Sequence, residues 1–239
     1  MKKLMGMMSV ALAMGLGLSA QAEERAWPWS PVGIGLAAPL QIPLMDSDVY
    51  GLRLDGFFGH SASVYGLDLG VAGMCTEDFI GLQGAAMTWT EGNACGLQVS
   101  SLANVVHGRA TGVQVGSVNV VWDDAVGVQL GSVNYTVNMR GLQVANVINW
   151  NNLASYGLEI SPINANQMEF TGAMFGGIVN YADSARGFSC GFVNVAYDYT
   201  GCQLGVVNAC DHMHGVQIGF INLICGSKLP IMVVANAWF

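Results

Sequence analysis

The densest group of metal-binding side chains in the sequence lies near its C-terminus, in the segment Cys210-Asp211-His212-Met213-His214. Two histidines at i and i+2 on an extended segment share a face, and imidazole together with carboxylate can hold a transition metal. No second ligand cluster at zinc-site spacing occurs elsewhere in the sequence. The segment is therefore more typical of a solvated turn, with His212 and His214 as candidate ligands.

Three carboxylates, Asp183, Asp198 and Asp211, each follow a recurring asparagine by three or four residues. If successive repeats stack, these acids form a column whose hard oxygen ligands suit Ca²⁺. The glycine-rich motif of calcium-binding rolls is absent from the sequence. We therefore expect exposed turn acids and no cofactor, with Ca²⁺ as the one candidate cation.

Two patterns raise the question of catalysis. The segment 187–191 matches the G-x-S-x-G nucleophile elbow, but neighbouring repeats place glutamine where Ser189 stands, so the repeat itself explains the motif. Turn carboxylates such as Asp123, Asp124 and Asp198 suggest, as an alternative, a polysaccharide-active β-helix enzyme. Glycosidases need two carboxylates at a fixed separation, and the sequence shows acids but no such pair. We expect no enzymatic activity and no catalytic residue.

These side chains belong to a framework of repeats. The segment 112–119 reads G-V-Q-V-G-S-V-N and returns fifteen residues later, at 127–134, as G-V-Q-L-G-S-V-N. A short fixed period of this kind predicts stacked equivalent units. Glycines recur at steps of 14 to 16 residues, at Gly51, Gly66, Gly81, Gly96, Gly112, Gly127, Gly141, Gly157, Gly172, Gly187, Gly201 and Gly215. Asparagines keep the same phase, at Asn104, Asn119, Asn134, Asn149, Asn164, Asn180, Asn194, Asn208 and Asn222. Glutamines take the third position, at Gln83, Gln98, Gln114, Gln129, Gln143, Gln203 and Gln217.

Each repeat predicts one short coil of an all-β, parallel β-solenoid with about twelve coils. The second and fourth positions are apolar and alternate with the glutamine, which indicates a strand with these apolar residues inward. A small residue at the fifth position predicts a corner, and the apolar seventh position is expected inward again. Identical residues then stack about 4.8 Å apart, which gives a rod of roughly 55 Å. Its asparagines are expected to hydrogen-bond between coils as a structural ladder.

The C-terminal segment suggests a second architecture. Alternating apolar residues from Ile231 to Phe239 resemble the closing strand of an outer-membrane protein, so the alternative fold is an antiparallel β-barrel. Membrane strands need about 9–11 residues of apolar alternation, whereas these repeats change phase after the fourth position. We therefore favour the solenoid, with residues 226–239 as a capping strand that covers an open edge.

The N-terminal segment predicts export. Residues 1–22 combine a basic start, an apolar stretch and an A-x-A motif, as a signal peptide does. Residues 23–50 are then a lead-in and cap, and residues 51–225 the solenoid. Removal of Lys2 and Lys3 would leave six basic residues against sixteen acidic ones, a formal charge of −10. Such an acidic chain lacks the basic footprint of a nucleic-acid-binding protein, which excludes that class.

An exported chain meets an oxidising compartment, so its six cysteines are candidates for disulfides. Cys210 and Cys225 follow consecutive ladder asparagines by two and three residues, where adjacent coils would bring them together. Cys190 and Cys202 fall at fourth and second positions, where an inward thiol can simply be buried. The repeat thus makes Cys210 and Cys225 a candidate disulfide, and Cys75 with Cys95 is a second candidate pair without such geometry.

The pattern as a whole resembles a known group of proteins. The segments 39–43 (P-L-Q-I-P), 48–54 (D-V-Y-G-L-R-L) and 64–70 (V-Y-G-L-D-L-G) precede repeats of the form G-[LV]-Q-[LIV]-G-x-[VI]-N. This combination is similar to bacterial exported proteins with surface repeats of about 15 residues. The resemblance covers about Pro39 to Asn222 and implies export and a repeat fold, and it supplies no catalytic residue to transfer. The repeats at Gly81 and Gly172 depart from the pattern, which predicts local irregularity there.

Together these features predict a non-enzymatic exported scaffold whose variable turns contact a protein or a glycan. The expected location is the cell surface, the outer membrane or the periplasm. The apolar C-terminal strand offers a route to membrane association. The competing classes are an outer-membrane β-barrel and the polysaccharide-active enzyme.

Overall fold

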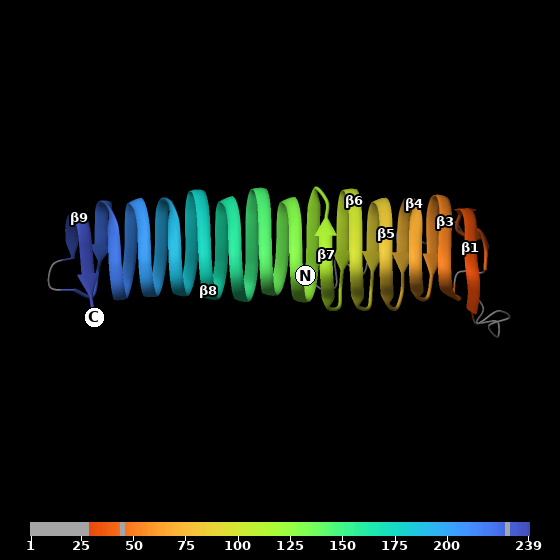
Figure 1. Ribbon diagram of the computed structural model, residues 1–239, viewed down its shortest axis with the longest axis horizontal. Helices are drawn as coiled ribbons and strands as arrows, with labels where there is room; N and C mark the ends of the chain where they lie inside the picture. Colours follow the sequence, from red (N-terminus) through yellow and green to blue (C-terminus); the bar gives the residue numbers. More distant parts are fainter. Residues whose placement is uncertain (1–28, 44–45, 228–229) are drawn as a thin grey trace.

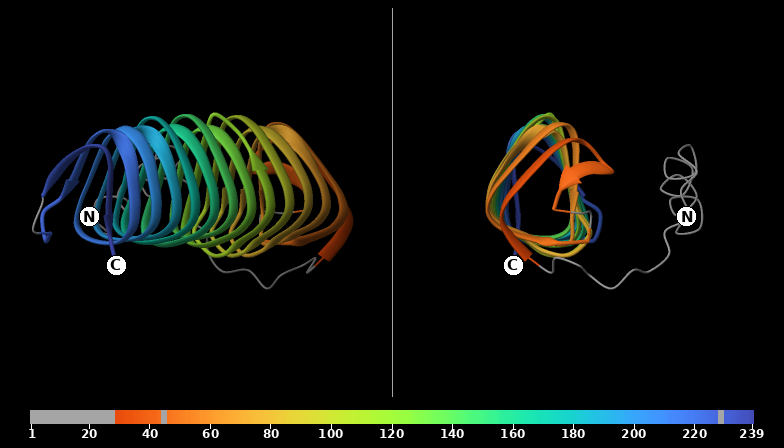
Figure 2. Two further views of the ribbon diagram at one scale, coloured as in Figure 1. Left: turned by 60° about the vertical axis from the view of Figure 1, so that its left-hand side comes forward. Right: turned by 90° about the vertical axis from the view of Figure 1, so that its right-hand side faces the viewer.

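The structure, a computed structural model, describes residues 29–43, 46–227 and 230–239. The expected signal peptide, residues 1–22, lies outside these ranges. The chain winds into a straight rod of stacked β-coils (Figure 1). Viewed along the rod, successive coils superimpose on one another (Figure 2). The protein is therefore the all-β solenoid that the repeat predicts.

The described residues form one sheet with the strand order β2-β1-β3-β4-β5-β6-β7-β8-β9. The last long strand, β8, passes from coil to coil without a break through the C-terminal half of the rod (Figure 1). The strands are β1 (Trp29–Ala37), β2 (Leu40–Ile42), β3 (Asp48–Ser61), β4 (Val64–Cys75), β5 (Phe79–Thr90), β6 (Ala94–Val106), β7 (Ala110–Val115), β8 (Val118–Ile224) and β9 (Ile231–Trp238).

Neighbouring coils pair in parallel, with equivalent repeat positions side by side. Gly66 pairs with Gly81, and Gly81 in turn with Gly96. The pairings of β1 with β3 and of each later strand up to β8 are all parallel, and antiparallel pairing occurs at β2 and β9. An antiparallel barrel reverses direction at every neighbour, so these registers overturn the barrel alternative.

The repeat glycine is required at the corner where each coil begins. All twelve repeat glycines have φ between 123° and 149°, a region that residues with side chains rarely adopt. A Cβ added at Gly127 would also overlap the carbonyl oxygen of Gly112, one coil earlier, and the same overlap recurs along the ladder. The backbone conformation and the neighbouring coil therefore both select glycine.

Additional strands lie against the two ends of the rod. β9 lies antiparallel on the last coil, pairing Gly215 with Trp238 and Leu223 with Ile231. At the other end, β1 lies parallel on β3, and β2 folds back on β1. These strands occupy backbone donors and acceptors that would otherwise form open sheet edges.

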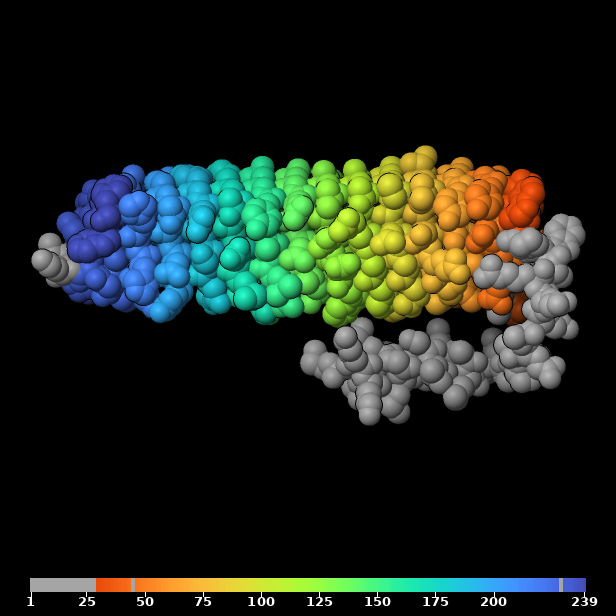
Figure 3. Space-filling model, turned by 90° about the horizontal axis from the view of Figure 1, so that it is seen from below, coloured from red at the N-terminus to blue at the C-terminus, as the bar shows by residue number. Residues whose placement is uncertain are grey.

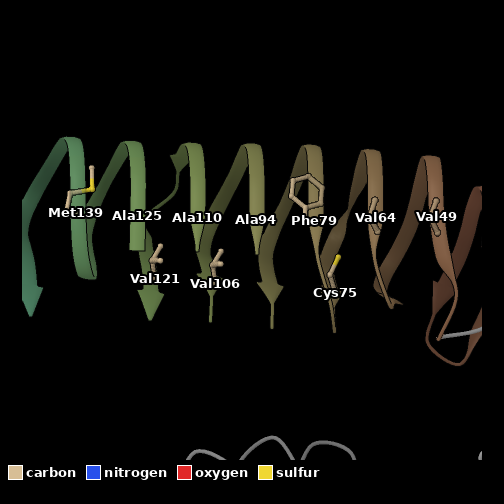
Figure 4. Close-up of a cluster of buried hydrophobic side chains, with 10 residues drawn as sticks. All are labelled: Val49, Val64, Cys75, Phe79, Ala94, Val106, Ala110, Val121, Ala125 and Met139. Carbon is tan, nitrogen blue, oxygen red and sulfur yellow. The ribbon is translucent and has the colours of Figure 1, made fainter. Parts of the chain in front are cut away.

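The apolar part of the interior consists of columns with one side chain per coil. Figure 4 shows two rows of buried side chains. The residues of one row lie two positions before the repeat glycines, and the second row runs beside the first. A second cluster, including Phe170 and Met174, continues toward the C-terminus. The first cluster comprises Val49, Val64, Phe79, Ala94, Ala110, Ala125 and Met139 in one row and Cys75, Val106 and Val121 in the other.

Candidate functional site

The apolar second and fourth positions face outward, which corrects the sequence-based expectation. No side chain at these positions is buried, whereas the glutamines at the third position are at most 4% exposed. The seventh position, also expected inward, is exposed at residues such as Val147 and Ile221. Alternation places the glutamines and their apolar neighbours on opposite faces of the strand. The glutamines occupy the interior because each amide finds a partner in the next coil.

The predicted asparagine ladder is present. From Asn104 to Asn222, the Nδ2 of each asparagine donates to the Oδ1 of the next at 2.8–3.0 Å. Thr88 begins the column by donating its hydroxyl to Asn104 at 2.8 Å. Each amide before the last also reaches a backbone carbonyl, as Asn119 reaches Leu130 at 3.0 Å. Both amide hydrogens are thus used, as burial of a primary amide requires.

The glutamines form a second amide column with the opposite direction. Gln98 Nε2 donates to Gln83 Oε1 at 2.8 Å, and equivalent bonds continue to Gln143. Glutamines therefore donate toward the N-terminus, whereas asparagines donate toward the C-terminus. The aligned amide dipoles of the two columns consequently oppose each other.

Charged residues close the N-terminal end of the glutamine column. Gln83 donates to Asp68 Oδ2 at 2.7 Å, and Arg53 neutralises Asp68 through hydrogen bonds of 2.7 and 2.6 Å. Arg53 Nε also lies 3.2 Å from Asp55. Burial raises the pKa of Asp55 to about 6, although the charge of Arg53 opposes this shift. Gly73 leaves the necessary room, because a Cβ there would lie 2.9 Å from Arg53 Nη2.

Glu159 interrupts the same column in the middle of the rod and is fully buried. Ser155 and Asn151 donate to Oε1 at 2.5 and 2.8 Å, and Asn166 donates to Oε2 at 2.9 Å. Burial raises the pKa of Glu159 from 4.5 to about 7, against the effect of these three hydrogen bonds. An ionised carboxylate cannot donate to Gln143 Oε1, and Asn151 donates to that oxygen instead, at 2.8 Å.

Sequence reasoning missed Arg53, Asp68 and Glu159 as buried charges. A signal was available, because each replaces glutamine at the third repeat position. With the apolar second and fourth positions assigned to the interior, the third position was assigned to the surface, where a charge needs no partner.

The candidate metal ligands do not form one column. By their offset from the ladder asparagines, Asp183 and Asp211 share one column two coils apart, and Asp198 and His212 lie in the next. His212 Nδ1 lies 3.2 Å from Asp198 Oδ1, while the ring of His214 packs edge-on against the terminal phenylalanine. The described part of the chain holds no group of three or more His, Cys, Asp or Glu arranged to hold a metal ion.

The expected Cys210–Cys225 disulfide is absent from the structure. The two residues lie in adjacent coils, since Cys225 N donates to Cys210 O at 3.0 Å, but both are free thiols. Their offsets from the ladder differ by one residue, and one residue reverses the side of a strand, so Cys210 is buried and Cys225 exposed. Burial raises the pKa of Cys210 to about 12 and keeps its thiol protonated.

Two of the residues that suggested catalysis, Asp124 and Ser189, are engaged in other contacts. Asn138 donates to Asp124 at 2.9 Å and Arg109 donates to it at 2.7 Å. These contacts lower the pKa of Asp124, whereas a glycosidase acid needs a raised pKa. Ser189 is buried and accepts a hydrogen bond from the Tyr199 hydroxyl at 2.9 Å.

An open pocket outside the repeat positions 1–5, called here the tyrosine–aspartate pocket, gathers some of the predicted acids. Two tyrosines, Tyr181 and Tyr197, and three carboxylates, Asp183, Asp198 and Asp211, contribute to its lining. Tyr181 donates to Asp183 at 2.6 Å, which raises the pKa of the phenol. Exposed aromatic rings beside carboxylates are suited to binding a polyhydroxylated ligand.

A continuous feature of the surface is an apolar wall, defined as the outward side chains at the second and fourth repeat positions from Leu52 to Ile218. Every one of these positions holds an aliphatic residue, Phe, Cys, Ala or Gly. Figure 3 shows how closely coils follow one another along a face of the rod. The most exposed wall residues are Leu54, Leu67, Leu69, Leu82, Val99, Leu130, Ile160, Phe175, Leu204 and Ile218.

The wall carries no charge. Across the first five positions of the repeats the charged residues are Arg53, Asp55, Asp68 and Glu159, and all four are buried. Two half-buried thiols, Cys190 and Cys202, lie within the wall. The expectation that these thiols point inward is therefore wrong.

Comparison with known protein families, with curated proteins and with solved structures gives no match. Among the described residues, no helix has the length and apolar character needed to cross a membrane. The interpretation of the site therefore depends on its own geometry.

Proposed function

We propose that the protein is a non-enzymatic repeat scaffold of the cell envelope or surface, and that its apolar wall is the surface that contacts a protein partner. The observation that carries this proposal is the uninterrupted, uncharged wall. Exposing such an area to water is unfavourable, and monomeric proteins rarely expose an apolar patch larger than about 300–600 Å². A surface of this kind is typical of an interaction site.

The interior supports this role because it holds the wall rigid. Each coil is fixed to the next by backbone pairing and by the buried amide columns. Wall residues of the same repeat position are thereby held at the spacing of neighbouring strands, about 4.8 Å. A rigid surface loses little conformational entropy when it binds.

The signal-like segment 1–22 and the resemblance to exported surface-repeat proteins support an envelope location. The exposed C-terminal strand, with Val233 and Phe239 in water, supports an additional contact at that end of the rod, including one with a membrane. Both are proposals about where the scaffold acts.

The native cysteines allow a direct test of whether the wall is covered. Cys190 and Cys202 lie in the wall, and the exposed Cys95 and Cys225 lie outside it. We expect a maleimide reagent to label the wall thiols at least about tenfold more slowly in isolated envelopes than in purified, detergent-free protein at nanomolar concentration. The labelling of Cys95 and Cys225 should be the same in both.

Mass spectrometry of each labelled cysteine gives the readout. Equal protection of all four thiols in envelopes would reflect restricted reagent access. Unprotected wall thiols in envelopes would contradict the proposed role of the wall.

A second candidate function is glycan binding in the tyrosine–aspartate pocket, favoured by its pairing of tyrosines with carboxylates. Tyr197→Ala should then abolish retention on the oligosaccharide that the wild-type protein binds in a glycan-array screen. Tyr156→Ala removes another exposed tyrosine, outside the pocket lining, and should leave retention unchanged. Absence of any glycan binding by the wild-type protein would exclude this function for the pocket.

A further inference from the structure

We propose that the apolar wall binds the wall of a second copy of this chain, so that two rods pair face to face. This inference rests on the proposed function and names the protein partner. It follows from three properties of the wall: its area, its position relative to the charges, and the sheet that forms it.

The area of the wall suits a stable dimer. Twelve coils at about 4.8 Å give a length of about 55 Å, and four extended residues give a width of about 13 Å. The resulting flat area of about 700 Å² is close to the roughly 800 Å² that each partner buries in a stable interface. Two copies of the wall also have the same length, so that each can cover the other.

The distribution of charge permits two acidic chains to pair. Exposed acids such as Asp123, Asp183 and Asp198 lie in the part of each coil that follows the ladder asparagine, outside the wall. Face-to-face packing of two walls leaves these carboxylates in water. Neither partner has to bury a charge, which is the main electrostatic cost of association.

The sheet itself favours another sheet as its partner. Parallel sheets occur almost always with both faces covered, and here the inner face alone is covered by the rest of the coil. Sheets pack at about 10 Å with their strands roughly aligned, and two walls of stacked aliphatic columns fit that arrangement. A lipid leaflet is the weaker alternative, because an acidic protein is repelled by anionic headgroups.

The test introduces opposite charges into two versions of the wall. The acidic variant carries Val128→Glu, Leu130→Glu and Val144→Glu, and the basic variant carries lysine at the same three positions. The chains are produced with the signal segment intact, purified without detergent and analysed by light scattering coupled to size exclusion.

The wild-type protein should have the mass of two chains. Each variant alone should have the mass of one chain, with the dissociation constant raised about 100-fold or more by like-charge repulsion. An equal mixture of the two variants should recover the mass of two chains. A control with Val120→Glu, Val137→Glu and Asn152→Glu adds the same charge outside the wall and should remain dimeric.

A monomeric wild-type protein at about 50 μM would overturn the dimer, since an interface of this size is stable in that range. If wall thiols are nevertheless protected in envelopes, the proposed function stands and the partner is a different molecule. Flotation of monomers with phosphatidylcholine vesicles would assign the wall to lipid and would equally overturn the dimer.

A variant-free measurement covers the case in which the charged walls fail to fold, as judged by circular dichroism. Diluting the wild-type protein from about 50 μM to about 50 nM should accelerate labelling of Cys190 and Cys202 as the dimer dissociates. The rates at Cys95 and Cys225 should stay constant. Unchanged labelling of the wall thiols while the mass falls from two chains to one on dilution would place the interface elsewhere and overturn the proposal.

Discussion

Buried amides are the residue-scale feature that organises this protein. A primary amide moved out of water without partners costs about 1–3 kcal/mol by mutational measures, so a core of amides is stable when each one is paired. The columns achieve this by repetition, because each residue supplies the partner that its neighbour needs. The same arrangement makes every rung depend on the two beside it.

Removal of one rung should therefore take one hydrogen bond from each of its two neighbours. Asn149→Ala takes away the acceptor of Asn134 at 2.9 Å and the donor to Asn164 at 3.0 Å. We expect the free energy of unfolding to fall by roughly 2–4 kcal/mol in urea denaturation. Asn146→Ala removes an asparagine at an exposed position in the same coil. This control should change the free energy of unfolding by less than about 0.5 kcal/mol. Equal effects of the two substitutions would count against the ladder as a source of stability.

Glu159 should make the stability of the protein depend on pH. Its pKa is raised from 4.5 to about 7 by burial, so the unfolded state releases this proton at lower pH than the folded state. The contribution of protonated Glu159 to the free energy of unfolding is fully present below about pH 4.5. It is lost as the pH rises through about 7, and the total loss is about 3 kcal/mol.

Glu159→Gln should remove this loss, because the introduced amide needs no ionisation and can donate along the column. The variant should melt at a higher temperature than wild type at pH 8 and show a smaller difference at pH 4.5. Glu169→Gln, at an exposed position nearby, serves as the control and should follow the wild-type profile. An unchanged wild-type profile in E159Q would refute the assignment.

At the scale of elements, the corner glycine decides whether one coil can lie on the next. Gly127→Ala should destabilise the protein by about 3 kcal/mol or more, since it combines a strained φ with overlap on the Gly112 carbonyl oxygen. Gly177→Ala is the matched control, because the added Cβ meets no atom closer than Pro162 Cα at 3.6 Å. Thermal unfolding of both variants checks this, and a tolerated G127A would show that the corner can relax.

The capping element β9 should keep the last coil from pairing with other chains. Truncation after Ser227 would leave the backbone of residues 215–223 as an open parallel edge. We expect assemblies that lengthen end to end with concentration, visible in sedimentation velocity and electron microscopy. Full-length protein at the same concentrations should show no such growth, and a truncated chain that behaves identically would show the cap to be dispensable.

At the scale of the whole molecule, the stack of coils predicts a rod. Small-angle scattering should give a maximum dimension of roughly 60 Å for the ordered part, set by twelve coils and the end strands. Face-to-face pairing would thicken the cross-section without lengthening the rod. A maximum dimension near twice this value would instead indicate end-to-end assembly.

The sequence alone determined the repeat and everything that follows from its period. The glycine and asparagine spacings predicted the coil, the parallel register and the ladder, because residues of one kind at one interval must meet their own kind when units stack. The period also shows that Arg53, Asp68 and Glu159 replace the recurring glutamine at the third position, although the pattern did not predict that they are buried.

The tertiary structure alone decided which face of each strand lies inside. The alternation of side chains along a strand places glutamine and its apolar neighbours on opposite faces, but it does not determine which face the coil encloses. Apolar burial ordinarily settles that choice, and here it gave the wrong result. Inside a narrow coil, an amide held one strand spacing from an identical amide can hydrogen-bond to it, so the glutamines and asparagines lie in the interior beside the apolar columns, and the aliphatic residues at the second and fourth positions form the wall.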